Sequence, residues 1–141
     1  MRKPEVFTRK KVHDYYWHED INCATVTLKI LSERCRIPLN SQVLDAAVGM
    51  YGAGEYGAQC GLVEGALMFL GIFGKAQGLK DVRIAEICKD FAKQFENRFG
   101  SLLCAVLRPQ GFRPENPPHL CEHLTCEALA FDMQFIYSLS A

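Results

Sequence analysis

Apolar residues recur at helical spacing along most of the chain. The clearest case is a stripe at steps of three and four residues, which a helix places on one buried face; it consists of Ile84, Ile87, Cys88, Phe91, Phe95 and Phe99. The same spacing predicts five further helices: one that stops near Pro38, one capped by Ser41, one that follows Cys60, a short one over Leu102–Leu107, and a last one from about His119 to Tyr137.

No segment of useful length alternates between apolar and polar residues, so we predict no strand. The chain shows no internal repeat and no linker, and its one clear loop is Pro109–Pro118. We therefore expect residues 1–141 to form a single all-α domain, a compact bundle of about five or six helices.

The charge balance argues against two classes of partner. Sixteen basic and sixteen acidic side chains give a net charge of zero, which predicts no electrostatic binding to nucleic acid or to a membrane. The best apolar stretch, Leu62 to Phe73, is shorter than the ~18 to 20 residues of a membrane span and contains Glu64. No secretory signal pattern follows the N-terminal basic residues. We therefore expect a cytoplasmic protein.

A glycine-rich segment, GMYGAGEYGAQCG, reads as a dinucleotide-binding pattern at Gly52, Gly54 and Gly57. That pattern binds a nucleotide only when a strand precedes it within a βαβ unit. The preceding residues, SQVLDAAVG, have a helical pattern instead. We therefore predict no nucleotide cofactor and interpret the glycines as a turn that brings the chain close around Cys60.

Seven cysteines are unusually many for a chain of this length, and the number is odd. In a reducing compartment such a set indicates redox chemistry or metal ligation more than a framework of disulfides. Four of them lie near predicted helix starts, where free backbone N–H groups and the helix dipole favour the thiolate. These are Cys23 after a cap at Asp20, Cys60 after the glycine segment, Cys104 after a cap at Ser101, and Cys121 after Pro117 and Pro118.

For every cysteine, the alternative to a functional role is packing in the core, because a buried thiol is also a small apolar group. It is the preferred explanation for Cys35 and for Cys88, whereas for the four at helix starts packing and function are evenly balanced. Cys126 follows Cys121 by five residues, about 140° around a helix, so the two do not share one site. His119 and His123 flank Cys121 at helical spacing, which is more typical of a solvated face than of a metal site.

Four stretches of the sequence contain cysteines in surroundings similar to those of a known family. They are NCATVTLKIL with Cys23, QCGLVEGALMFLG with Cys60, RFGSLLCAVL with Cys104, and HLCEHLTCEAL with Cys121. In this order they resemble the C_GCAxxG_C_C family of redox-active proteins, over nearly the whole chain from Asn22 onward. Gly61 and Gly65 match the glycines of its C-G-A-x-x-G motif, whereas Leu62 stands where alanine is usual. Cys121 aligns better than Cys126 with the family's fourth cysteine.

The resemblance implies a helical, four-cysteine protein of prokaryotic type with redox activity. A related helical domain occurs in split-Soret cytochromes, for which an iron–sulfur centre has been inferred. This chain has no C-x-x-C-H haem-attachment motif, so we predict no covalent haem.

We therefore expect Cys23, Cys60, Cys104 and Cys121 to converge as catalytic residues or metal ligands, with Gly61 giving close access to Cys60. Two mechanisms fit: electron transfer through an iron–sulfur cluster held by the four thiolates, and thiol–disulfide exchange. The alternatives are a structural or binding protein with a closed zinc site, and an interaction module with packed thiols. The expected partner is a redox protein or a small thiol or disulfide substrate, and small residues on the Cys60 helix favour a homodimer.

Overall fold

The computed structural model describes residues 3–139, and within them it contains helices and a single antiparallel bridge, between Gln59 and Leu103. The helices are α1 (Lys3–Trp17), α2 (Cys23–Cys35), α3 (Ser41–Ala46), α4 (Gly52–Glu55), α5 (Gly61–Ala76), α6 (Asp81–Phe99), α7 (Cys104–Leu107) and α8 (Glu122–Leu139). The all-α prediction is confirmed. The predicted number of five or six helices is wrong, because the described residues form eight.

The two helices that the sequence does not predict, α1 and α4, have only a weak periodic pattern of apolar residues. α1 carries many charged residues and shows no strong apolar stripe. α4 is a four-residue turn within the glycine segment, and Ala53 and Gly54 in it have left-handed backbone angles. α1 has the three- and four-residue spacing of apolar side chains over one turn, at Val12, Tyr15 and Tyr16, and α4 does not have it. Neither element therefore has the sustained spacing on which sequence-based assignment of a helix depends.

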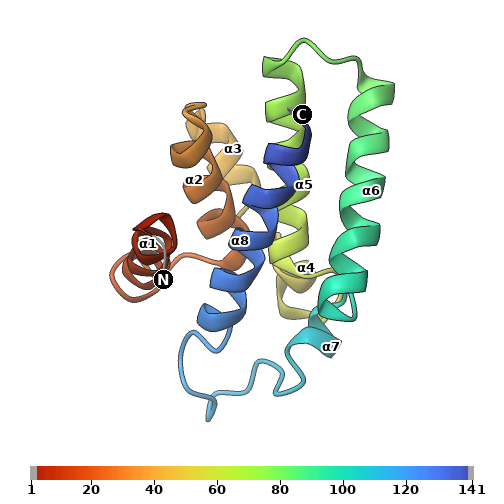
Figure 1. Cartoon of the computed structure of the whole chain (residues 1–141). Coiled ribbons are helices and arrows are strands. Elements are labelled where there is room, and N and C mark those ends of the chain that lie inside the picture. The colour runs from red at the N-terminus through yellow and green to blue at the C-terminus, as the bar shows by residue number, and fades with distance from the viewer. Residues whose placement is uncertain (1–2, 140–141) are drawn as a thin grey trace.

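The long helices are arranged so that three of them begin at the same end of the molecule. Figure 1 shows α2, α5 and α8 running in one direction, with α6 returning antiparallel to α5 after a short turn. α7 and the loop that follows it lie at the end where α2, α5 and α8 begin (Figure 1). This end therefore collects several helix N-termini.

The closest packing in the bundle is between α2 and α5. Gly65 of α5 lies against Ala24 of α2, so near that a Cβ on Gly65 would come within 2.6 Å of the Ala24 carbonyl oxygen. Gly61 and Ala66 are buried on the same helix. The small residues of α5 therefore serve packing within the chain, and the face that favoured a homodimer in the sequence is covered by α2.

A cluster of phenylalanines joins α6 to α8. Phe91 packs edge-on against Phe135 at a ring separation of 5.3 Å, and Phe95 packs edge-on against Phe131 at 5.9 Å. Phe91 and Phe95 are almost fully buried. The apolar stripe of α6 therefore faces the core, as its spacing predicts, and holds α8 in place.

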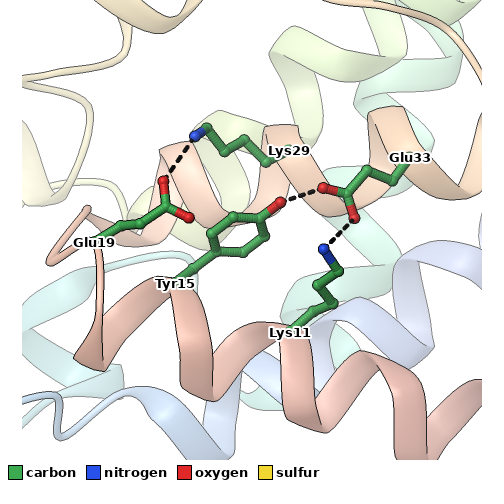
Figure 2. A network of polar contacts seen from close by, with 5 residues as sticks. All are labelled: Lys11, Tyr15, Glu19, Lys29 and Glu33. Atoms are coloured by element: carbon green, nitrogen blue, oxygen red, sulfur yellow. Dashed lines mark hydrogen bonds and ion pairs between the residues drawn. The ribbon is translucent and has the colours of Figure 1, made fainter.

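Polar contacts fix α1 to α2, as Figure 2 shows. The Tyr15 hydroxyl donates to Glu33, which also pairs with Lys11 at 3.8 Å. Glu19, just after α1, pairs with Lys29 of α2 at 3.2 Å. These contacts are at the surface, so each contributes little energy; together they set the orientation of α1 beside the bundle.

The start of α2 differs from the prediction. Asn22 caps the helix, and its Oδ1 accepts a hydrogen bond from the backbone N–H of Thr25 at 2.9 Å. Asp20, the predicted cap, has a left-handed φ of 51° and lies before the helix. Asparagine and aspartate are equally good caps, so composition does not distinguish them. As a result Cys23 is the first helical residue instead of the third.

The starts of α3, α7 and α8 also differ. Asn40 occupies the cap position of α3. α7 begins at Cys104 itself, because the Ser101 hydroxyl accepts from the Leu103 N–H in the preceding turn. His119 has a left-handed φ of 59°, so α8 cannot start there, and it starts at Glu122. Cys121 consequently lies directly before the helix instead of in its second turn.

Candidate functional site

Four cysteines lie at four helix starts. Cys23 and Cys104 are the first residues of α2 and α7, and Cys60 occupies the cap position of α5. The Cys121 carbonyl accepts the first helical hydrogen bond of α8, from the Thr125 N–H at 2.8 Å, so Cys121 also occupies a cap position. These are the cysteines that the sequence singles out, and the bundle brings their helix starts to one end (Figure 1).

Cys23 and Cys121 lie close enough to influence each other's ionisation. Interaction with Cys121 and burial raise the pKa of Cys23 well above its usual value, whereas interaction with Cys23 lowers the pKa of Cys121. Cys121 therefore loses its proton more readily than Cys23.

Arg108 helps to explain why Cys121 loses its proton more readily. Its Nη1 donates to the Cys121 sulfur at 3.7 Å. The guanidinium is held in place by stacking over the Phe112 ring at 4.1 Å and by donation from Nε to the Gly111 carbonyl at 2.8 Å. With the interaction with Cys23, the Arg108 charge outweighs burial and lowers the pKa of Cys121 to about 6. These contacts favour the thiolate form of Cys121.

Cys60 and Cys104 form the other part of the site, on two segments joined by the β-bridge. The Cys60 N–H donates to the Leu102 carbonyl at 2.8 Å, and the Cys104 N–H donates to the Ala58 carbonyl at 2.7 Å. Both side chains are buried. Burial raises the pKa of Cys60 to about 12 and also raises that of Cys104, and neighbouring cysteine charges act in the same direction.

At Cys60 and Cys104, burial opposes the effect of the helix start on the pKa of the thiol. Backbone N–H groups of Leu62 and Val63 do lower the pKa of Cys60, but the cost of burying its charge is larger. Among the described residues, only Cys121 has a cationic side chain donating to its sulfur. Cys121 therefore loses its proton more readily than Cys60.

The glycine segment lies around a different cysteine from the one predicted. Gly52, with a left-handed φ of 65°, packs so closely on Cys104 that a Cβ there would lie 3.1 Å from the Cys104 Cβ and 3.2 Å from its sulfur. Gly61 lies against Cys23, and a Cβ on it would meet the Cys23 Cβ at 3.1 Å and the Met50 carbonyl at 2.9 Å. The space beside Gly61 is thus filled by the chain itself.

The remaining cysteines lie apart from this cluster. Cys35, Cys88 and Cys126 are half-buried, and burial raises the pKa of each. Cys126 lies within α8, five residues after Cys121, and is not among the groups that shift the pKa of Cys23. Cys121 is therefore the one of these two cysteines that lies beside Cys23.

Two residues near the cysteines, Tyr16 and Arg108, have no signal in the sequence analysis. The hydroxyl of Tyr16, from α1, lies 2.8 Å from the Thr125 Oγ1. Arg108 follows α7, and its contact with Cys121 spans the loop between α7 and α8. Neither belongs to a short motif, so a single sequence does not reveal these contacts. His119, which the sequence assigns to a solvated face, stacks on Tyr16 and Trp17 with ring separations of 5.2 and 4.8 Å.

The arrangement of the possible metal-ligating side chains decides whether the site fits a metal ion. Among residues 3–139, no three or more His, Cys, Asp or Glu side chains are grouped so that they could hold one. The four sulfurs as placed therefore do not fit a zinc ion or an iron–sulfur cluster. In the same residues, no helix is both long and apolar enough to cross a membrane.

Comparison with known proteins agrees with the cysteine pattern. A family model described as "Putative redox-active protein (C_GCAxxG_C_C)" matches residues 21–134. Comparisons with curated proteins and with solved structures gave no match. The match begins after α1 and includes all four cysteines of the site. The chain therefore belongs to the C_GCAxxG_C_C family of redox-active proteins.

Proposed function

We propose that the protein carries out thiol–disulfide exchange, with Cys121 as the attacking cysteine and Cys23 as the resolving one. The observation that carries the proposal is the position of Arg108, whose Nη1 donates to the Cys121 sulfur at 3.7 Å. A thiolate is the form that attacks a disulfide, and a thiol pKa close to ambient pH gives the best attacking group. With a pKa of about 6, Cys121 meets this requirement.

Each step of the reaction balances in atoms and electrons. The Cys121 thiolate attacks one sulfur of a substrate disulfide, and the other half of the substrate leaves as a thiolate. Cys23 then gives its proton to water and attacks the Cys121 sulfur, which releases the rest of the substrate as a second thiolate and leaves a Cys23–Cys121 disulfide. The substrate gains two electrons and the cysteine pair loses two, and an external dithiol reduces the pair again.

Ionisation favours Cys121 for the first attack. Burial keeps Cys60 and Cys104 protonated at neutral pH, so neither competes with Cys121. Their closeness to Cys121 makes them the next thiols that a disulfide formed there would meet.

A metal centre is the second candidate, favoured by the gathering of four cysteines at helix starts. It requires the sulfurs to move, because they are not grouped as ligands within the described residues. Anaerobic purification followed by iron, sulfide and zinc assays tests it. Stoichiometric metal that is lost when Cys60 or Cys104 is replaced by Ser would overturn the exchange mechanism.

The exchange mechanism is tested with a chromogenic aromatic disulfide that releases a coloured thiolate. We expect the reduced protein to release a first equivalent rapidly and a second as Cys23 resolves the mixed disulfide. Cys121→Ser should abolish the rapid phase, and Cys23→Ser should trap the mixed disulfide. Cys126→Ser, on the same helix, is the matched control and should react like the wild type. A rapid phase that survives in Cys121→Ser would refute the assignment.

A further inference from the structure

Arg108 has more hydrogen-bond donors than its contacts within the protein use. A guanidinium carries five N–H groups in one plane. Nε donates to the Gly111 carbonyl at 2.8 Å, and Nη1 donates to the Cys121 sulfur at 3.7 Å. Among residues 3–139, the Arg108 side chain donates to no other acceptor. Three N–H groups, one on Nη1 and two on Nη2, are therefore free to bind a ligand beside the Cys121 sulfur.

No carboxylate of the described residues balances the charge of Arg108. Other basic side chains do have acidic partners, as Arg83 has Glu86 at 3.4 Å, but no such ion pair includes Arg108. Arg108 is half-buried, and a cation that is partly removed from water needs a nearby anion. Within the part of the chain that the structure describes, the group that can supply this negative charge is the Cys121 sulfur.

The exchange reaction proposed above removes that negative charge. The Cys121 sulfur forms a bond to one sulfur of the substrate, the S–S bond of the substrate breaks, and the other half leaves as a thiolate with the electron pair. The charge thus moves from Cys121 to the leaving group, and Arg108 remains beside a neutral mixed disulfide. A carboxylate on the half of the substrate that stays bound replaces the lost charge.

Arg108 is held in a position that suits a planar anion. Its guanidinium lies over the Phe112 ring at 4.1 Å, and this ring packs edge-on against Tyr51 at a ring separation of 6.3 Å. The bond from Nε to the Gly111 carbonyl fixes the rotation of the guanidinium about the stack. A carboxylate accepts two parallel hydrogen bonds from such a group, and these bonds are stronger than those between neutral groups.

We propose that Arg108 selects small disulfides that carry a carboxylate close to the sulfur that Cys121 attacks. The inference rests on the exchange mechanism. The carboxylate must lie close to the attacked sulfur, because the guanidinium that binds it is 3.7 Å from the Cys121 sulfur. The substrate is a small molecule because Cys121 is buried, with 8% of its surface exposed, which admits a narrow ligand more readily than the surface of a folded protein.

The test compares two small disulfides that differ in charge, dithiodipropionate and its neutral diamide. The rate at which the reduced full chain consumes each disulfide is followed by quenching with acid and mass spectrometry of the intact protein. Each rate is divided by the rate of the same disulfide with free mercaptoethanol, which corrects for intrinsic reactivity. We expect the wild type to prefer the dicarboxylate by about tenfold or more, the effect of a charge-assisted hydrogen bond.

Three variants identify the group that causes this preference. Arg108→Met should lose the preference completely. Arg108→Lys keeps a positive charge but replaces the planar fork by a single ammonium group, so it should lose most of the preference. Arg113→Met is the matched control, because it removes the same charge from an exposed position of the same loop, and it should keep the full preference. The preference is a ratio, so a change in Cys121 that slows both reactions equally does not affect it.

The outcomes separate this inference from the proposed function. Failure of the wild type to consume either disulfide would refute the exchange mechanism itself. Equal corrected rates for the two disulfides in the wild type would refute the role of Arg108 and leave the mechanism intact, and this comparison needs no variant to fold. A preference that is unchanged in Arg108→Met or Arg108→Lys, or is lost equally in Arg113→Met, would also overturn the proposal.

Discussion

The buried carboxyl of Asp132 is expected to lower the stability of the folded protein increasingly as the pH rises. Replacing Asp132 by Asn should remove this loss. Asp132 lies in α8 with 1% of its surface exposed, and neither carboxyl oxygen has a hydrogen-bond partner among the described residues. Burial raises the pKa of this carboxyl well above its usual value. The folded protein therefore holds it protonated at pH values where the unfolded chain, with an aspartate pKa of about 3.9, has released the proton.

The sign and size of the effect follow from proton linkage. Above pH ~4 the unfolded state binds fewer protons than the folded state, so the free energy of unfolding falls as pH rises, by about 1.4 kcal/mol per pH unit. The loss continues up to the pKa of the folded carboxyl and disappears below that of the unfolded chain. Asparagine does not ionise, so the advantage of Asp132→Asn over the wild type should grow at this rate.

Urea unfolding followed by far-UV circular dichroism, in a thiol reductant and between about pH 5 and 6.5, measures this difference. Subtracting wild type from variant at each pH cancels the titration of all other groups. Asp90→Asn, at an exposed aspartate of α6 that bonds only to Gln94, is the control and should leave the pH dependence unchanged. A constant difference between Asp132→Asn and wild type would refute the reasoning.

Two further substitutions test the site and the packing. Arg108→Met removes the cation beside Cys121, so the pH at which half of Cys121 is alkylated by iodoacetamide should rise by about one unit or more, as read by peptide mass spectrometry; an unchanged midpoint would contradict the role of Arg108. Gly65→Ala places a methyl group 2.6 Å from the Ala24 carbonyl and should cost about 1–3 kcal/mol in urea unfolding, whereas Gly71→Ala, with nothing within 4 Å, should keep or raise stability.

The extent to which the fold follows from the sequence depends on how each helix buries its surface. α6 carries its apolar residues in one stripe, so both its existence and its buried face are predictable. α1 buries Val12, Tyr15 and Tyr16 at helical spacing, but this stripe spans one turn and does not stand out in the sequence. Its polar contacts, such as Trp17 to Glu122, leave no periodic pattern. The sequence does not predict the first residue of a helix where two neighbouring residues are equally good caps, as with Asp20 and Asn22.

The site divides in the same way between local and distant contacts. The four cysteines could be predicted because each lies in a short recognisable stretch at a helix start. Tyr16 and Thr125 are 109 positions apart in the chain, and their contact exists only once α1 has packed on α8. Arg108 reaches Cys121 across a proline-containing loop whose course depends on Phe112 stacking. Such pairings are set by tertiary structure, and one sequence contains no record of them.

Position at a helix start and ionisation are separate properties of these cysteines. Cys60 occupies a cap position with backbone N–H groups at its sulfur, yet burial raises its pKa to about 12. Cys121 occupies the same kind of position, and the Cys23 thiol and Arg108 lower its pKa to about 6 despite burial. The helix start therefore orients the sulfur, and the hydrogen bond and charge on its other side decide whether it is a nucleophile. Within this fold, moving that cation would change how readily each cysteine loses its proton.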